Sequence, residues 1–166
     1  MSADRAESVR VERMRWWDLE AVGRIEADRF GDQAWSAAQL WAELARVPES
    51  RRYVVARSAG EVVGYAGLFL VRPEADVQTI AVARGAQGRG IGRALLTALA
   101  DQARTAGADV LHLEVRADNA AARSLYAAFG FGPDGRRRDY YGPGCDAVLM
   151  SLRLAGDGPR PGGADA

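Results

Sequence analysis

A short glycine-rich segment, residues 87–93, most constrains the fold of this chain. It lies between an apolar run at residues 79–83 and a run with helical periodicity that begins at Ala94, and it carries three glycines within five residues. A strand that enters a helix through such a loop leaves backbone N–H groups uncovered at the helix N-terminus, where the helix dipole favours negative charge. The segment therefore predicts a strand–loop–helix unit that holds a phosphate group.

The two common nucleotide loops do not fit this segment. A Walker loop needs Gly-Lys followed by Ser or Thr, and the segment has neither. A Rossmann loop needs its third glycine three residues after the second, where this chain has Arg93, and no ribose-binding acid follows at the expected spacing. At this point two interpretations stay open, a loop for another phosphate ligand and an ordinary glycine-rich turn.

Composition excludes several other classes of protein. The chain of 166 residues is in the range of one domain, and its 22 basic and 22 acidic residues give no global charge that would favour nucleic acid or an anionic membrane. One cysteine and one histidine cannot form a disulfide or a usual zinc site. No apolar run has the length of a membrane span, and the N-terminus lacks the apolar core of a signal peptide. We expect a cytoplasmic protein without a metal, with a single domain of residues 8–154 between disordered ends at residues 1–7 and 155–166.

Hydrophobic periodicity and capping residues predict an alternation of strands and helices. Strands are expected at residues 9–13, 53–56, 62–71, 76–83, 110–115 and 147–152. Helices are expected over residues 18–30, with Asp18 as N-cap, from Ser36 to the proline at 48, over residues 89–105, and from Asn119 to residue 129. Residues 131–146 are expected to connect the last helix to the last strand.

The strand at residues 110–115 has two different faces. Its alternation places Leu111, Leu113 and Val115 on one face, and Val110, His112 and Glu114 on the other. One face therefore belongs to the core, and the other carries an acid.

Motifs on both sides of this strand resemble those of one enzyme family. Gln87, Gly90 and Gly92 match the pattern Q/R-x-x-G-x-G/A, and Leu-Glu-Val-Arg at 113–116, Asn-Ala-Ala-Ala at 119–122 and Leu-Tyr at 125–126 follow it. Together they resemble the GCN5-related N-acetyltransferases (GNAT). Ala-Trp-Ser at 34–36 and Arg-Arg-Asp-Tyr-Tyr at 137–141 are closer to the RimI-type branch, which acetylates the N-terminal alanine of a small-subunit ribosomal protein.

The resemblance covers about residues 9–154 and implies a fold. We expect a single α/β (α+β) domain with a mixed, mostly antiparallel, strongly twisted sheet. Helices should cover both faces of the sheet, and the sheet should be splayed near the strand that holds the cofactor.

The resemblance also implies acetyl-coenzyme A as cosubstrate and assigns residues to it. The loop residues Gln87, Gly88, Arg89, Gly90, Ile91, Gly92 and Arg93 would grip its pyrophosphate. Backbone groups of Ile80, Ala81 and Val82 would pair with its pantetheine like an added strand, with the Val82 N–H polarising the thioester carbonyl. Asn119 would bond the pantetheine, or only cap its helix. The strand could equally be an ordinary sheet strand, and the two arginines could be solvated.

Two residues have the chemistry of acid and base for acetyl transfer to an amine. Glu114 could take the proton of the amine directly or through water, and Tyr126, at the position of the family's general acid, could protonate the departing thiolate. An N-terminal amine has a pKa of about 7.7–8.0, against about 10.4 for lysine, so a weaker base is enough to deprotonate the N-terminal amine. The alternatives are a carboxylate that is exposed or paired with Arg116, and a core tyrosine.

Aromatic residues are candidates for binding the acceptor. Trp35, Tyr140 and Tyr141 could hold the first residues of a peptide, or pack in the core or on the surface. The arginines at 136–138 could attract an acidic tail or RNA, but a solvated hairpin edge is the commoner role. A covalent route through Cys145 lacks a second histidine to activate the thiol, so direct transfer is favoured.

The sequence thus predicts N-terminal acetylation of a protein, most simply a ribosomal protein, by a monomer that binds neither nucleic acid nor membrane. Acetylation of a lysine side chain or a small amine stays open. A non-catalytic acyl-coenzyme A binding module is the alternative outside the enzymes. The sequence does not determine the acceptor.

Overall fold

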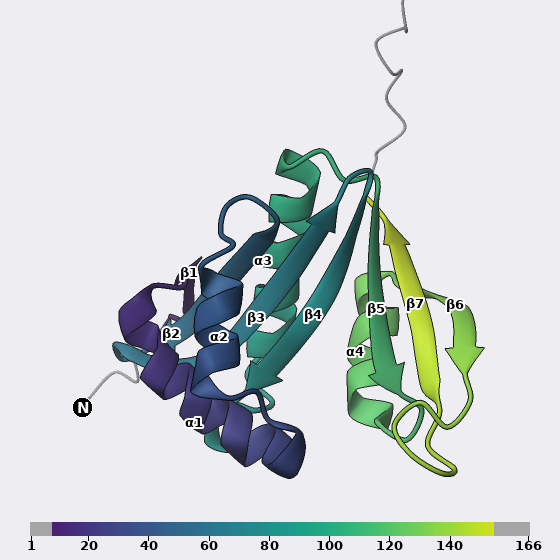
Figure 1. Cartoon of the computed structure of the whole chain (residues 1–166), viewed down its shortest axis with the longest axis horizontal. Helices are drawn as coiled ribbons and strands as arrows, with labels where there is room; N and C mark the ends of the chain where they lie inside the picture. Colours follow the sequence, from purple (N-terminus) through teal and green to yellow (C-terminus); the bar gives the residue numbers. More distant parts are fainter. Residues whose placement is uncertain (1–7, 155–166) are drawn as a thin grey trace, which may run out of the picture.

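Seven strands form one sheet in the order β1-β2-β3-β4-β5-β7-β6 in the computed structural model, which describes residues 8–154 (Figure 1). The strands are β1 Arg10–Arg13, β2 Arg51–Ser58, β3 Glu61–Val71, β4 Glu74–Val82, β5 Val110–Arg116, β6 Gly132–Arg137 and β7 Ala147–Arg153. The helices are α1 Leu19–Phe30, α2 Ala37–Leu44, α3 Ile91–Thr105 and α4 Ala120–Phe129, with 3₁₀ turns η1 Trp16–Asp18, η2 Gly31–Gln33 and η3 Arg84–Ala86. Residues 1–7 and 155–166, which we expected to be disordered, lie outside the described residues.

The sheet is splayed between β4 and β5. These two strands are the parallel pair in an otherwise antiparallel sheet, and they pair only from Glu74↔Val110 to Asp76↔His112. Beyond these residues the two strands diverge, and their far ends are well separated (Figure 1). The expected mixed and splayed sheet is confirmed.

A β-bulge in β4 accounts for part of this divergence. Thr79 pairs with Gly67 on β3 while Val77 pairs with Leu68, so Gln78 is an extra residue. A bulge bends its strand and increases the local twist. The bend lies just beyond the last residue that β4 pairs with β5.

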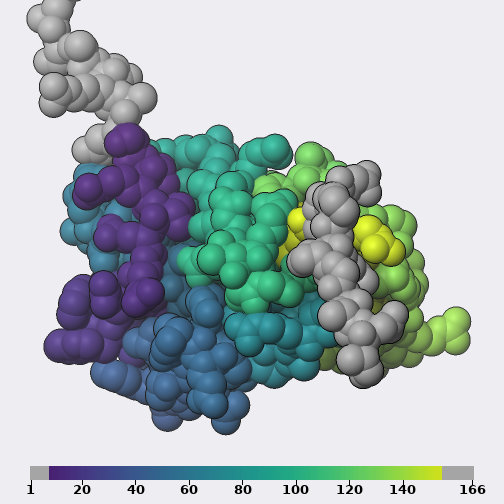
Figure 2. Space-filling view, turned by 90° about the horizontal axis from the view of Figure 1, so that it is seen from above, coloured from purple at the N-terminus to yellow at the C-terminus, as the bar shows by residue number. Residues whose placement is uncertain are grey.

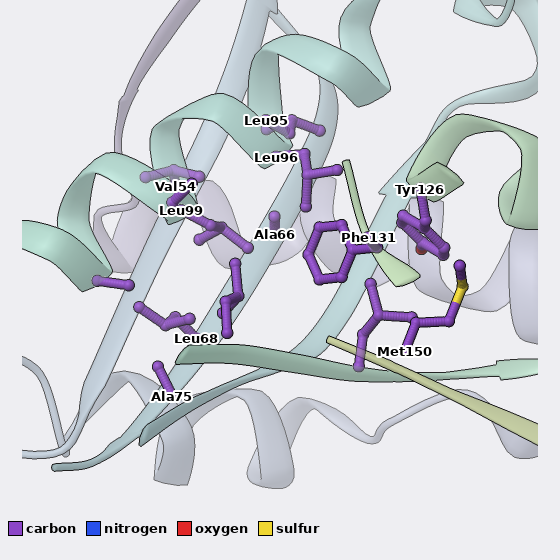
Figure 3. Packing of buried hydrophobic residues seen from close by; sticks show 14 of the residues in the cluster. Val54, Ala66, Leu68, Ala75, Leu95, Leu96, Leu99, Tyr126, Phe131 and Met150 are labelled. Atoms are coloured by element: carbon purple, nitrogen blue, oxygen red, sulfur yellow. The ribbon is translucent and has the colours of Figure 1, made fainter. Parts of the chain in front are cut away.

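Helices α3 and α4 cover one face of the sheet and α1 and α2 the other (Figure 1). Figure 3 shows how leucines of α3 meet the sheet residues Val54, Ala66 and Leu68, while Phe131 and Met150 extend this core toward α4. Close packing of α3 depends on Gly64, because a Cβ there would lie 3.1 Å from the Leu95 side chain and 3.0 Å from the Ala81 carbonyl oxygen. Seen from above, the segments follow one another across the molecule from the N-terminal segment in purple to the last strands in yellow and green (Figure 2).

Most helix ends follow the predicted capping residues. Ser36 and Gln39 form the expected capping box, and the Asn119 side chain accepts the Ala122 N–H at 3.1 Å. Asp18 stands at the N-cap position of α1 as predicted, but it also ends η1, and its side chain makes no capping hydrogen bond to α1. Its buried carboxylate instead accepts the Arg15 N–H at 2.8 Å and pairs with Arg57.

The other difference is strand β6. Its sequence, Gly-Pro-Asp-Gly-Arg-Arg, has no apolar alternation, and we expected only a connection there. Pairing with β7 along the outer edge of the sheet makes it a strand, so the arginines at 136 and 137 lie on a solvated hairpin edge. Among residues 8–154, no helix has both the length and the apolar character needed to cross a membrane.

Candidate functional site

The glycine loop has the backbone geometry of an open anion site. Gly88 and Gly90 have φ values of 75° and 76°, and Gly90 is the N-cap of α3 without a side-chain hydrogen bond. A Cβ at either position would meet nothing within 4 Å, and residues 87–90 are exposed. Glycine is therefore required by conformation and not by packing, since other residues reach this left-handed region only at a cost. The first N–H groups of α3 face outward, as a phosphate ligand requires.

The side chains of the loop are attached to the surrounding structure. The Arg89 guanidinium donates to Ser58 Oγ at 3.2 Å, the Arg93 guanidinium lies 5.5 Å from the centre of the Phe129 ring, and Gln87 Nε2 donates to the Val82 carbonyl at 3.5 Å. Ile91 is 2 % exposed and belongs to the core. The two arginines contribute positive charge near the loop, while the backbone N–H groups are its free donors.

Gly92 has a different role from the two preceding glycines. A Cβ at Gly92 would lie 3.1 Å from a terminal methyl of Leu125 on α4. The small residue therefore lets the start of α3 approach α4 closely. This contact ties the loop to the helix that carries Asn119 and Tyr126.

The edge of β4 that faces the splay is open. The Ala83 N–H donates to the Val63 carbonyl at 2.8 Å, and Val82 pairs opposite Gly64. In an antiparallel ladder, this pattern directs the N–H and C=O of Val82 away from β3. By the same alternation Ile80 also presents its backbone to the splay, whereas the backbone of Ala81 faces β3. Because β5 pairs with β4 only as far as Asp76, an extended ligand can add to this edge like a strand.

Glu114 lies on β5, on the face opposite the core that α3 and α4 cover. Its carboxylate pairs with Arg137 of β6 at 3.1 Å, and its side chain is 30 % exposed. Arg116, the partner considered from sequence, instead makes two bonds to Asp118 at 3.0 and 3.1 Å. Glu114 therefore keeps one carboxylate oxygen oriented by a guanidinium and remains accessible from the open face of the sheet.

Tyr126 lies in the core on the other side of the sheet. It is 6 % exposed, and its ring centre lies 6.0 Å from that of Phe131 (Figure 3). Burial, with a smaller effect of the Tyr141 charge, raises the pKa of Tyr126 to about 12. The hydroxyl is therefore protonated at neutral pH, as a proton donor must be.

Tyr141 lies within electrostatic reach of both groups. Burial raises the pKa of Tyr141, and the Glu114 charge raises it further. The Tyr141 charge also raises the pKa of Tyr126, although Glu114 and Tyr126 lie on opposite faces of the sheet. The Tyr140 and Tyr141 rings pack edge to face with centres 5.0 Å apart, and the Arg137 guanidinium lies 5.5 Å from the Tyr140 ring centre. The connection between β6 and β7 thus brings Tyr140 to Arg137, the partner of Glu114, and brings Tyr141 within electrostatic reach of Glu114.

Trp35 lies elsewhere, between η2 and α2, where it packs against the core under α1. The backbone N–H of Trp35 donates to Glu26 Oε1 at 3.0 Å. Within residues 8–154, no hydrogen bond or ring contact joins Trp35 to Tyr140 or Tyr141. The three aromatic candidates therefore divide into one residue over β3 and β4 and two residues beside β5 and β7.

Two polar residues near Glu114 were weighed from sequence and take other roles. His112 shares its face and lies 3.4 Å from Glu74 and 3.8 Å from Asp134. The Cys145 thiol contacts Asp118 at 3.7 Å, and burial raises its pKa. A raised pKa leaves less thiolate, so Cys145 is not an activated nucleophile.

Sequence reasoning missed the side chain that holds Glu114. Arg137 was noted only as part of a basic run, because the strand that places it beside Glu114 has no recognisable pattern. Within residues 8–154, no group of three or more His, Cys, Asp or Glu side chains could hold a metal ion. A cavity of about 500 Å³ lies at the C-terminal end of α3, on the side away from the glycine loop, and is not part of this site.

Comparison with known proteins identifies acetyltransferases among the relatives of this chain. The model of the acetyltransferase (GNAT) family matches residues 10–131. The chain is 43 % identical over 163 residues to the N-alpha-acetyltransferase RimI of Mycobacterium tuberculosis, with 95 % of this chain and 99 % of that protein covered. It is 35 % identical over 143 residues to the ribosomal protein bS18-alanine N-acetyltransferase of Salmonella typhimurium, which covers 83 % of this chain and 93 % of that protein.

A solved structure extends the likeness to the fold. The ribosomal-protein-S18-alanine N-acetyltransferase from Escherichia coli superimposes with a TM-score of 0.78 at 32 % identity. The match covers 92 % of this chain and 99 % of that chain. The fold of this chain is therefore one that a similar acetyltransferase shares.

Proposed function

This chain belongs to the GNAT family of acetyltransferases, and we propose that within it the protein transfers the acetyl group of acetyl-coenzyme A to the N-terminal α-amino group of a protein. The proposed acceptor is the N-terminal alanine of a small-subunit ribosomal protein. This choice is supported by the activity for which the similar Salmonella and Escherichia coli enzymes are named.

One observation carries the proposal. The open backbone edge of Ile80 and Val82 continues into a loop whose glycines have positive φ at a helix N-terminus. An edge of this kind suits the amides of a pantetheine chain, and the loop suits a pyrophosphate. Acetyl-coenzyme A carries both groups on one molecule, and it supplies the activated acetyl group.

The side chains around the splay suit the remaining steps. The Val82 N–H, turned away from β3, can donate to the thioester oxygen as negative charge develops on it. Glu114 accepts the proton that the amine nitrogen loses as its bond to the acetyl carbon forms. Tyr126 donates its phenolic proton to the sulfur as the carbon–sulfur bond breaks. Transfer is then direct, and no step uses Cys145.

The choice of an α-amine over a lysine amine follows from the acid–base balance. An α-amine with a pKa of about 7.7–8.0 is partly neutral at physiological pH, and a lysine amine with a pKa of about 10.4 is not. Glu114, which pairs with Arg137 and is partly exposed, is suited to accepting the proton of an α-amine. The lysine and small-amine acceptors are the alternatives that the experiment below separates.

The test measures coenzyme A release with two peptides that are derived from the ribosomal protein and differ in the amine they offer. One has a free N-terminal alanine, and the other is blocked at its N-terminus and carries a lysine. Turnover of the free peptide alone is expected, with kcat lowered about 10²- to 10⁴-fold by Glu114→Gln and by Tyr126→Phe, the range for loss of a general acid or base. The affinity for acetyl-coenzyme A should remain that of the wild type in both variants.

Three results would contradict the proposal. Turnover of the blocked peptide alone would move the acceptor to lysine. Tight binding of acetyl-coenzyme A without turnover of either peptide would favour a small amine or a binding module. Wild-type kcat in both variants would remove Glu114 and Tyr126 from the mechanism.

A further inference from the structure

A buried carboxylate joins helix α1 to Trp35 and, through Tyr65, to strands β3 and β4. Glu26, near the end of α1, is 2 % exposed. Its carboxylate accepts hydrogen bonds from the backbone N–H of Trp35 at 3.0 Å and from the hydroxyl of Tyr65. Tyr65 belongs to β3 and has no exposed surface. The Tyr65 hydroxyl also lies 3.2 Å from Thr79 Oγ1 on β4. The chain of contacts therefore runs from Trp35 through Glu26 and Tyr65 to Thr79.

The partners of Glu26 distinguish it from the other buried charged groups. Asp18 pairs with Arg57, and Arg51 pairs with Glu43, so each of them has an opposite charge. The described hydrogen-bond partners of Glu26 are both neutral donors. Burial accordingly raises the pKa of Glu26, and the bond from the Trp35 N–H offsets this only in part.

A carboxylate buried in this way is a poor source of stability. Removing a charge from water is costly, and well-packed apolar side chains often serve a core equally well or better. The site gains instead a fixed geometry, because a carboxylate with two directional donors allows few arrangements of the groups around it. The two segments that Glu26 fixes are the backbone at Trp35 and, through Tyr65, the bulged part of β4.

We propose that Glu26 is a positioning residue for acceptor binding. It holds Trp35 at a set distance from Thr79, which directly precedes the Ile80 backbone on the open edge of β4. This inference rests on the proposed function, because it assigns Trp35 and the part of β4 at Thr79 to the side where the peptide N-terminus enters.

The network does not include the glycine loop, which is the proposed pyrophosphate side of the cofactor site. None of its four residues lies in the glycine loop, and the described hydrogen bonds of Glu26 and Tyr65 join only α1, Trp35, β3 and β4. Disturbing the network should therefore raise the KM for the acceptor peptide by a larger factor than the Kd for acetyl-coenzyme A. A purely structural role would lower stability without this separation.

The test compares three variants and a matched control. Glu26→Leu leaves the Trp35 backbone N–H and the Tyr65 hydroxyl without their acceptor. Tyr65→Phe removes the hydroxyl contacts with both Glu26 and Thr79 and keeps the bond from the Trp35 backbone to Glu26. Glu26→Gln keeps an acceptor oxygen for Trp35 and serves as the conservative rescue. Asp18→Asn is the control, since Asp18 is a buried carboxylate at the opposite end of α1 with the same 2 % exposure.

The KM for the free-ended peptide is expected to rise about tenfold in Glu26→Leu, within the range of about 5- to 150-fold that a buried unsatisfied donor costs. Tyr65→Phe should raise this KM less than Glu26→Leu does. The double variant should have nearly the KM of Glu26→Leu, because the effects of substitutions within one network are not additive. Glu26→Gln should restore most of the wild-type KM. Asp18→Asn should lower the melting temperature and leave the KM unchanged.

Other readouts keep the inference separate from the proposed function. The Kd for acetyl-coenzyme A is measured by calorimetry, and amide exchange at Trp35 is followed by mass spectrometry. Faster exchange in Glu26→Leu than in Asp18→Asn is expected whether or not a peptide is acetylated. Wild-type turnover with an unchanged KM in Glu26→Leu, or equal exchange in the two variants, would overturn the inference alone. Failure of the wild type to acetylate the peptide would overturn the proposed function and the acceptor role with it.

Discussion

Replacing Gly90 by alanine tests whether backbone conformation, and not side-chain contact, makes the loop a phosphate site. Gly90 is the N-cap of α3 at φ 76° and ψ 10°, in the left-handed region. An alanine Cβ at this position would meet no atom within 4 Å. The substitution therefore adds no clash, and its whole effect comes from the preference of alanine for other backbone conformations.

The size of the effect follows from that preference. The left-handed conformation costs an L-residue about 1–2 kcal/mol relative to the right-handed one. Residues 87–90 are exposed, so the loop without ligand is free to relax into other conformations. The fraction of molecules with the loop ready to bind should then fall about 5- to 30-fold, and the apparent Kd should rise by the same factor.

The assay is calorimetric titration with acetyl-coenzyme A. Gly85→Ala is the matched control, because Gly85 belongs to the neighbouring 3₁₀ turn, has no positive φ and also has open space around its Cβ position. We expect Gly90→Ala to raise the Kd about 5- to 30-fold and Gly85→Ala to leave it unchanged. The KM for the acceptor peptide should not change in either variant.

Two results would refute this reasoning. Equal Kd values for the two variants would mean that the conformation at Gly90 does not matter for binding. In the second result, the Kd is unchanged and the free energy of unfolding falls by about 1–2 kcal/mol, the full cost of the left-handed conformation. This result would mean that the protein holds the loop in place without the ligand. The first result would also weaken the assignment of residues 87–93 to the pyrophosphate.

Two further predictions concern stability. The pKa of Tyr126 is raised from 10.0 to about 12, so the folded state holds this proton more strongly, and the free energy of unfolding should fall as the pH rises from about 10 to about 12. The loss should be on the order of 3 kcal/mol, and urea titrations at several pH values should show a smaller loss in Tyr126→Phe; an identical pH dependence would contradict the burial of the hydroxyl. Gly67→Ala would place a Cβ 2.2 Å from the buried Tyr53 ring, so it should lower the free energy of unfolding by about 1–3 kcal/mol. Its urea midpoint should fall at constant slope, whereas wild-type stability would show that the ring can move aside.

Local sequence signals predicted the parts of the site that depend on local chemistry. The glycine loop could be recognised because a positive φ at an N-cap needs glycine, and the capping box at Ser36 uses only residues three apart. The strand of Glu114 could be recognised because its apolar residues alternate, and the structure buries Leu111, Leu113 and Val115 as expected. In each case the cause and its effect lie within a few residues of each other.

Distant partners could not be predicted in the same way. Arg137 reaches Glu114 only because β6 follows the edge of β7, and β6 contains glycine and proline in place of apolar residues. Asp18 has the residue type of an N-cap, but Arg57, 39 residues away, competes for its carboxylate. Glu26 looks like any charged residue of an amphipathic helix, and its burial follows from Tyr65 beneath it. Such pairings depend on the sheet order, which no local pattern contains.

The position of the site follows from a single irregularity of the sheet. Gln78 adds one residue to β4, and beyond Asp76 the strand no longer pairs with β5. A strand edge inside a sheet is costly to leave open, because its backbone groups need partners. We infer that a ligand which supplies these partners would bind along the edge of β4 beyond Asp76, where β5 no longer pairs with it. On this argument, restoring regular pairing by deleting Gln78 would close the edge at Ile80 and Val82 and remove acetyl-coenzyme A binding, even though Glu114, Tyr126 and the glycine loop would all remain.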